Sequence, residues 1–290
     1  MNGLPGMPWP LPWPFDRTYM QLALLAGLVV GAAAPLIGAF LVQKRLSLIG
    51  DGIGHAAVAG VGAGLLTGIG ATWTALVAAV AAALAIEWLR SRRGTSGDLA
   101  LALVFYGGIA AGVVLASRST DTNLQPYLFG SILTVDTADA YTILALGLVI
   151  ALAIAFTGRA LLAVVIDEES ARVTGIPARA LNCVLAVLTA VTIVAAMRVV
   201  GVLLVAALMV LPVASSRLLA RSFRGTVLGA VAAGVVAVTA GLAASRQWAL
   251  AAGGTIVLVA VGVFALTSIA HALRPGRRAV DSRALLSGPE

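Results

Sequence analysis

Residues 199–220 read VVGVLLVAALMVLPVASSRLLA, a stretch that carries one charged residue, Arg217. A helix of about 20 apolar residues crosses a hydrocarbon core of roughly 30 Å. The rest of the chain has a similar character: 60% of the 290 residues are hydrophobic, 11% are charged, and the mean hydropathy is +1.03. Soluble domains carry about 25% charged residues. The sequence therefore predicts an all-α polytopic membrane protein.

Nine windows of this kind follow one another along the chain. They lie near residues 18–42, 46–69, 71–89, 98–117, 137–158, 178–197, 199–220, 226–245 and 248–273. The second window is the least secure because it contains seven glycines, so we predict a transmembrane helical bundle of eight or nine spans. Residues 127–135 are too few to span a bilayer and are expected to form a re-entrant or surface helix.

The two ends of the chain differ from its apolar middle. Residues 1–17 are rich in proline and tryptophan, and proline at this density cannot form the helix of a signal peptide. Tryptophan favours the headgroup layer of a membrane. We therefore expect an uncleaved interfacial segment at 1–17, a transmembrane domain at 18–273 and a tail at 274–290.

The basic residues predict the orientation of the chain. When the nine windows alternate in direction, fifteen Lys and Arg residues fall on one side and four on the other, namely Arg17, Arg118, Arg198 and Arg246. Basic residues concentrate on the cytoplasmic side of membrane proteins, so the N-terminus is predicted outside and the tail in the cytoplasm. This topology and the attraction of membrane lipid explain the net charge of +7, and no nucleic-acid-binding motif is present.

Asp51 and His55 are the polar residues that most need an explanation. They lie four residues apart in the segment LIGDGIGHAA, residues 48–57, so a helix places both on one face. At the helical rise per residue, Asp51 would lie about 9–10 Å beyond Lys44 and Arg45, and His55 about 6 Å further, near the membrane centre. Ionisable groups at that depth are costly and mark paths for ions, protons or substrates.

Two explanations of this pair remain open. In one, the Asp51 carboxylate is hydrogen-bonded to nearby backbone, with His55 as its partner. In the other, the pair binds a cation, because carboxylate and imidazole ligands suit zinc and accept manganese. Two ligands are too few for a closed site, which has four, but they suit a path that must release its ion. We therefore predict a transient metal site at Asp51 and His55.

Other polar residues have structural explanations. Glu87 lies one turn before Arg90 and is expected to form a local ion pair, and His271 is expected at the membrane interface. Cys183 is the only cysteine, which excludes an intrachain disulfide and a cysteine-rich metal site. Small-residue motifs allow close helix packing, expected within one bundle in preference to a dimer interface. These motifs are Gly60-x-x-x-Gly64-x-x-x-Gly68 and Gly108-x-x-x-Gly112.

A charged segment, DEESARVTGI at residues 167–176, lies between the fifth and sixth windows. The acids Asp167, Glu168 and Glu169 open it, Gly175 lies near its end and Pro177 follows. Acids in the first turn and glycine at the end predict a short amphipathic helix. Taken alone, the segment fits an ordinary capped loop and a cytoplasmic docking element equally well.

Three motifs together resemble one family of membrane proteins. Residues 46–56 contain Asp51, three further residues, and then His55 followed by alanine; residues 127–130 read YLFG; and residues 200–212 open with Val-Gly and end on proline after an apolar run. On these motifs the chain, from about Leu22 to Ala270, resembles the permease subunits of the bacterial zinc/manganese family of ABC importers, of the high-affinity zinc uptake membrane protein type.

The resemblance implies a machine of several subunits. It implies two copies of the permease, a separate ABC ATPase subunit, and an extracellular or periplasmic metal-binding protein. This chain has no phosphate-binding loop with a Lys-Ser or Lys-Thr ending, so it is not expected to be an enzyme. The resemblance associates Asp51 and His55 with the translocation path. It also matches Glu169, Ala171 and Gly175 to a helix that couples the permease to its ATPase, and Asp167 and Glu168 belong to the same helix.

The leading hypothesis is therefore a permease that imports a divalent metal, with zinc preferred and no permanently bound cofactor. Manganese or iron is the alternative cargo, because two ligands do not separate ions that differ mainly in softness and geometry. A secondary cation transporter driven by an ion gradient is the alternative of another class, and it would be supported by an inverted repeat. No convincing repeat is present in the sequence, and an intramembrane enzyme lacks a nucleophile–base–orienter set.

Overall fold

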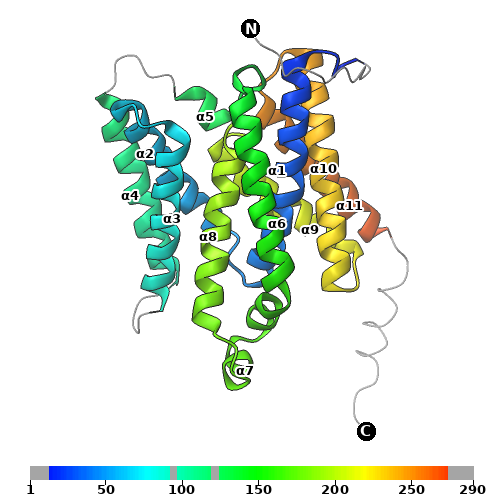
Figure 1. The fold of residues 1–290 in the computed structure, drawn as a ribbon. Helices are drawn as coiled ribbons and strands as arrows, with labels where there is room; N and C mark the ends of the chain where they lie inside the picture. The colour runs from blue at the N-terminus through cyan, green and yellow to red at the C-terminus, as the bar shows by residue number, and fades with distance from the viewer. Residues whose placement is uncertain (1–12, 92–96, 119–123, 274–290) are drawn as a thin grey trace.

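The computed structural model describes residues 13–91, 97–118 and 124–273 of the chain. The predicted tail at 274–290 and residues 1–12 of the predicted interfacial segment lie outside these ranges. The described residues form helices and no strands, and nine helices are long and apolar enough to cross a membrane (Figure 1). The all-α fold is confirmed.

Each predicted window overlaps one long helix, so the glycine-rich second window is a span like the others. The long helices are α1 (Thr18–Gln43), α2 (Ile49–Thr67), α3 (Ala71–Arg90), α4 (Gly97–Ser117), α6 (Thr137–Ile166), α8 (Ala178–Ala196), α9 (Val202–Leu219), α10 (Phe223–Trp248) and α11 (Ala252–Ala272). The short elements are α5 (Gln125–Phe129), the 3₁₀ helix η1 (Ile132–Thr134) and α7 (Glu168–Val173). Residues 127–135 therefore fold as two short pieces, as their length predicts.

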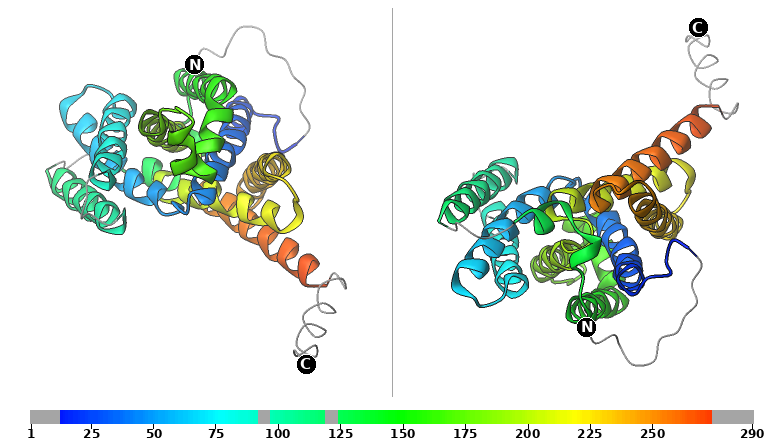
Figure 2. Two further views of the ribbon diagram at one scale, coloured as in Figure 1. Left: turned by 90° about the horizontal axis from the view of Figure 1, so that it is seen from below. Right: turned by 90° about the horizontal axis from the view of Figure 1, so that it is seen from above.

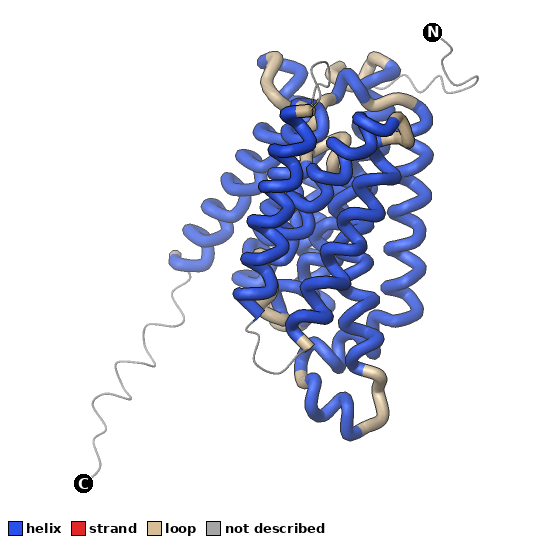
Figure 3. Tube along the Cα trace, turned by 90° about the vertical axis from the view of Figure 1, so that its left-hand side faces the viewer, coloured by secondary structure: helices blue, strands red, loops and turns tan. Residues whose placement is uncertain are grey.

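The bundle has a central helix and a lateral group. α1 packs on α6, α8, α9 and α10, while α2, α3 and α4 pack on one another and join the rest through α2 on α9 and α3 on α8. Figure 2 shows α4 and α11 at opposite edges when the bundle is viewed along its helices. α7 projects beyond the long helices at the end opposite the start of α1 (Figure 3).

Two helix boundaries differ from the sequence prediction. α6 continues to Ile166, past the predicted end at 158, because residues 159–166 stay apolar after a single Arg159. α2 begins at Ile49 and not at 46. The chain turns before it, with Arg45 in the left-handed region at φ 60°.

The glycine motifs pack inside this one chain, as expected. A Cβ atom added to Gly60 would lie 2.6 Å from the Thr74 carbonyl oxygen of α3, and one added to Gly108 would lie 2.9 Å from the His55 carbonyl carbon of α2. Neither distance leaves room for a larger residue without shifting backbone. Gly108 of α4 therefore helps to fix the part of α2 that carries His55.

Candidate functional site

Asp51 and His55 lie on the accessible face of α2. Asp51 is in the first turn of the helix and His55 is one turn further on, and both side chains are half-buried. Ala59 and Ala63 continue the same face at intervals of four residues and are also partly exposed. These four partly exposed residues follow one another at intervals of one helical turn, and we call the face that they form the accessible face of α2.

The position of Asp51 differs from the sequence prediction in one respect. It was expected 9–10 Å along a helix that continued from Lys44 and Arg45, but residues 44–48 form a turn that reverses the chain before α2 begins. Figure 1 shows α2 beginning within the height of the bundle, and Gly50 beside Asp51 packs level with Ala206 in the first half of α9, so Asp51 lies away from the end at which α1 finishes. The mid-membrane depth expected for His55 stays a prediction.

Glycines on either side of this face bring α2 close to its neighbours. A Cβ atom on Gly50 would lie 3.3 Å from the Ala206 Cβ of α9, and one on Gly54 would lie 3.3 Å from the Val202 carbonyl oxygen. On the other side, a Cβ atom on Gly52 would lie 2.7 Å from a methyl carbon of Leu101 in α4. Three alternate glycines thus let α2 fit between α9 and α4 without rotating Asp51 into the core.

The two polar side chains have few partners. Neither makes a hydrogen bond or an ion pair with any residue in the described part of the chain, so the backbone-bonded carboxylate weighed from the sequence is not observed. The His55 ring packs edge-on against Phe105 of α4, with ring centroids 4.6 Å apart. Across residues 13–91, 97–118 and 124–273, no group of three or more His, Cys, Asp or Glu side chains could hold a metal. The predicted metal site at Asp51 and His55 stays a prediction.

Phe105 was not predicted from the sequence. An isolated phenylalanine in an apolar window carries no signal of its own. The spacing of Gly108 and Gly112 was the available clue, because it predicts a close helix contact at that level of α4.

The predicted helix between the fifth and sixth spans is confirmed as α7. The Asp167 carboxylate accepts hydrogen bonds from the Glu169 N–H (3.0 Å) and the Ser170 N–H (3.1 Å), which caps the helix. Hydrogen bonds from the Ser170 side chain and backbone hold the pKa of Asp167 below its ordinary value. At the other end Gly175 has φ 82°, and the Ile176 N–H donates to the Ala171 carbonyl over 3.0 Å.

The five residues predicted for ATPase coupling have different surroundings. Asp167 and Gly175 shape the two ends of α7, and Ala171 is buried against the bundle. Glu168 faces inward, while Glu169 is exposed and its side chain makes no hydrogen bond or ion pair within the described residues. Asp167 is exposed as well but accepts hydrogen bonds, so Glu169 is the exposed acid whose side chain has no hydrogen bond or ion pair among the described residues.

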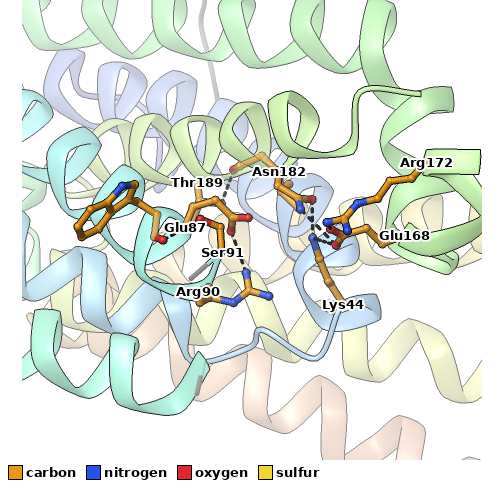
Figure 4. A network of polar contacts seen from close by, with 10 residues as sticks. Lys44, Glu87, Arg90, Ser91, Glu168, Arg172, Asn182 and Thr189 are labelled. Atoms are coloured by element: carbon orange, nitrogen blue, oxygen red, sulfur yellow. Dashed lines mark hydrogen bonds and ion pairs between the residues drawn. The ribbon is translucent and has the colours of Figure 1, made fainter. Parts of the chain in front are cut away.

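Glu168 lies in a polar network that joins three parts of the fold (Figure 4). Its carboxylate pairs with Lys44 Nζ at 3.3 Å and with Arg172 Nη2 at 2.5 Å. The Asn182 Nδ2 of α8 donates to the same carboxylate over 3.2 Å, and Lys44 Nζ donates to Asn182 Oδ1 over 2.5 Å. Partial burial raises the pKa of Glu168, but the hydrogen bond from Asn182 and the charges of Lys44 and Arg172 outweigh it, so the pKa is lowered. Sequence reasoning missed Lys44 and Asn182.

The end of the bundle opposite α7 has its own ion pairs. Arg198 pairs with Asp139 at 2.5 Å and lies over the Tyr127 ring, 4.9 Å from its centroid. Arg246 pairs with Asp16 at 2.6 Å, which fastens the segment before α1 to the end of α10. Arg17 also pairs with Asp16 at 3.6 Å, so three of the four basic residues predicted on the outer side are matched by acids.

The remaining sequence predictions concern local residues. The Glu87–Arg90 ion pair is confirmed at 2.9 Å within α3. His271 lies in the last turn of α11, and its Nδ1 is buried without a hydrogen-bond partner among the described residues. Its interfacial location stays a prediction.

Comparison with known proteins decides the family. The model of the ABC 3 transport family matches residues 16–271. The chain belongs to the ABC 3 transport family. This confirms the family indicated by the three sequence motifs, and it favours an ABC permease over a transporter driven by an ion gradient.

Two curated relatives of this ABC 3 transport protein have names that specify different metals. The chain is 34% identical over 251 residues to the manganese transport system membrane protein MntC of Halalkalibacterium halodurans, with 86% of each chain covered. It is 29% identical to the high-affinity zinc uptake system membrane protein ZnuB of Haemophilus influenzae, covering 84% of this chain and 95% of that one.

A solved structure matches the fold of this ABC 3 transport protein over most of its length. The structure of PsaBC from Streptococcus pneumoniae in complex with Fab contains a chain that is 30% identical. The match covers 87% of this chain and 91% of the other, with a TM-score of 0.79. The overall backbone fold is therefore shared with a solved relative.

Proposed function

We propose that this chain is the membrane permease subunit of an ATP-driven importer of a divalent transition metal, and that Asp51 and His55 bind the ion transiently on its path. The observation that carries the proposal is a carboxylate and an imidazole on the accessible face of α2, without hydrogen bonds or ion pairs to the described residues. Ligands that must take up and release a cargo ion need to be free of permanent partners.

Two ligands from one chain suggest how the site is completed. Homodimeric assembly across a two-fold axis would double the set to two carboxylates and two imidazoles. Four ligands are the number that zinc prefers. In this arrangement the accessible face of α2 is the face that meets the second copy.

Zinc is the preferred cargo, because imidazole nitrogen binds it well and carboxylate oxygen is acceptable to it. Manganese or iron is the alternative. The names of the relatives support manganese and zinc alike, since the H. halodurans protein is a manganese system component and the H. influenzae protein belongs to a zinc uptake system.

The two ends of the bundle suggest the other partners. α7, with Glu169 facing outward, would seat on a separate ATPase subunit, which hydrolyses ATP. The opposite end, where Arg198 and Arg246 lie, would face the outside and receive the ion from a metal-binding protein. This is the orientation that the basic residues predict.

Reconstitution tests the proposal. The permease is placed in proteoliposomes with its ATPase and its metal-binding protein, and uptake of radioactive zinc and manganese is measured separately. Uptake is expected with ATP and not when the ATPase carries an inactivated nucleotide site. Equal uptake with that inactive ATPase would contradict the ABC mechanism. Competition between the two metals at equal concentration then decides the cargo.

A further inference from the structure

The network around Glu168 connects α7 to helices that are not its neighbours in sequence. α7 follows α6 directly and leads into α8, so covalent links to those two helices are unavoidable. The contact with Lys44 is different, because Lys44 is the residue that ends α1, far earlier in the chain. Figure 4 shows Lys44, Asn182 and Glu168 converging from α1, α8 and α7.

Burial makes this connection a firm one. The Lys44 side chain is 11% exposed and that of Glu168 is 31% exposed, and Asn182 is buried. An ammonium group this deep requires its partners, because removing one leaves a charge without compensation. Lys44 Nζ has both an amide oxygen and a carboxylate oxygen within reach. If α7 moves, the end of α1 is therefore held to it by charge and hydrogen bonding.

The turn after Lys44 passes such a movement on to α2. The Leu46 N–H donates to the Leu41 carbonyl (2.8 Å) and the Arg45 N–H donates to the Val42 carbonyl (3.2 Å), the two bonds of a Schellman motif. The Asp51 N–H then donates to the Leu48 carbonyl (3.1 Å). The Ile49 N–H donates to the Leu46 carbonyl between them (3.1 Å), so successive hydrogen bonds run from the end of α1 into the first turn of α2.

We propose that Lys44, held by Glu168 and Asn182, is the positioning residue through which movement of α7 reaches Asp51. Lys44 binds neither metal nor nucleotide in this scheme. It converts a displacement of α7 by the ATPase into a displacement of the start of α2, where the metal ligands lie. The inference rests on the proposed function, since it takes α7 as the ATPase-coupling helix.

The test separates coupling from folding by measuring two quantities in one preparation. The complete complex, with ATPase and metal-binding protein, is reconstituted in proteoliposomes, and both ATP hydrolysis and uptake of Zn²⁺ or Mn²⁺ are recorded. For Lys44→Met we expect the ATPase to co-purify, hydrolysis to stay within about twofold of wild type, and ions transported per ATP to fall by about tenfold or more. Lys44→Arg keeps the charge, so the number of ions transported per ATP should stay close to that of wild type.

A matched control comes from the same end of the bundle. Arg90 pairs with Glu87 of the same helix, α3, and is similarly sheltered, with its side chain 22% exposed. Arg90→Met removes a basic partner of an acid without separating two elements, so the number of ions per ATP should equal that of wild type. Glu168→Gln should lower the ratio as Lys44→Met does, and the double variant should be no worse than either single one, because both break one connection.

Three results would overturn the inference. One is a wild-type ratio of ions to ATP in Lys44→Met, and another is a proportional loss of hydrolysis and uptake, which marks a structural anchor only. The third is an equal fall in Arg90→Met. If Lys44→Met does not accumulate in membranes, Asn182→Leu and Glu168→Gln break the same connection from α8 and α7 and decide the question by the same ratio. Failure of the proposed function is a separate result, because the wild-type complex would then show no ATP-dependent uptake.

Discussion

Asp51 and Glu168 are carboxylates in equivalent helix positions with opposite surroundings. Each lies in the first turn of its helix, but α7 projects beyond the long helices whereas α2 begins within the height of the bundle (Figure 1). Glu168 is paired with Lys44 and Arg172 and accepts a hydrogen bond from Asn182. Asp51 has no hydrogen bond or ion pair among the residues that the structure describes.

The difference separates two uses of a charge in one membrane protein. A carboxylate that holds elements together must be saturated by the protein, because a partly buried charge is stable only with partners. A carboxylate that binds a passing ion must instead be left incomplete, and the ion supplies the missing charge. In this chain Glu168 has the first character, and the role proposed for Asp51 requires the second. The following predictions are arranged by the size of the effect expected.

The largest effect is expected from substitution of Asp51 and His55, the two proposed metal ligands. Asp51→Asn and His55→Ala each remove one of the two ligands that a chain supplies, so metal uptake at normal expression should fall by about 100-fold. Insertion and ATPase co-purification should be unchanged, because neither side chain makes a hydrogen bond or an ion pair within the described part of the chain. Uptake of radioactive metal by a strain lacking the native permease measures the loss.

The chain offers a matched control for each variant. His271 is the only other histidine, and Asp98 lies in the first turn of another span, α4. His271→Ala and Asp98→Asn should leave uptake within about twofold of wild type. Uptake that survives Asp51→Asn and His55→Ala to the same degree would remove these residues from the path.

The second effect is a loss of stability at Asn182. Asn182→Ala takes the acceptor from Lys44 and the amide donor from Glu168, so two partly buried charged groups each lose a partner. Leaving such groups unsatisfied costs about 1–3 kcal/mol. The thermal unfolding midpoint of the detergent-solubilised protein should fall by several degrees.

Ser215 provides the comparison for this variant. Its hydroxyl is equally buried, but it donates to the Leu211 carbonyl one turn earlier in its own helix. Ser215→Ala should therefore change the midpoint far less than Asn182→Ala. Equal midpoints for the two variants would mean that the network around Glu168 is not a stabilising connection.

Much of this fold could be predicted from composition, because a bilayer admits few structures. Nine apolar windows gave nine helices, and the ends of α7 were readable from Asp167 and Gly175, whose effects act within a few residues. The end of α6 could not be predicted in the same way. Residues 159–166 were expected in a loop, but they are apolar enough to continue the helix.

The partners of the site were beyond local reasoning. Lys44 and Asn182 are 138 residues apart, and nothing in either segment states that α1 and α8 meet at that level. Phe105 reaches His55 only because α4 packs on α2. In helices that are apolar all round, periodicity does not identify the neighbouring helix, so contacts between spans need the structure.

The third effect concerns the two turns that flank this network. α1 and α7 both end in a Schellman motif, with Arg45 in the left-handed position of one and Gly175 in that of the other. A residue with a Cβ costs roughly 1–2 kcal/mol in that conformation. Gly175→Ala should therefore destabilise the end of α7 and reduce ATPase co-purification, whereas Arg45→Gly should leave the thermal midpoint unchanged or slightly higher. A loss of stability in Arg45→Gly similar to that in Gly175→Ala would show that the Arg45 side chain, and not its backbone, matters at the α1 turn.

The smallest effect is a pH dependence that belongs to Glu168. Its pKa in the folded chain lies below the ordinary value of 4.5, so the folded state binds its proton less readily than the unfolded state does. The stability that the network contributes is therefore complete above pH 4.5 and is lost as the pH falls through the lower pKa of the folded state. Other carboxylates titrate in the same range, so the useful quantity is the difference in thermal midpoint between wild type and Glu168→Gln, followed from pH 7 to pH 3. The difference in thermal midpoint should be constant between pH 7 and about pH 4.5. It should shrink at lower pH, where the wild-type carboxylate becomes neutral as well.

A difference in midpoint that does not change with pH would mean that Glu168 acts through packing alone. The contrast with Asp51 would then not be one between a charge with partners and a charge without them.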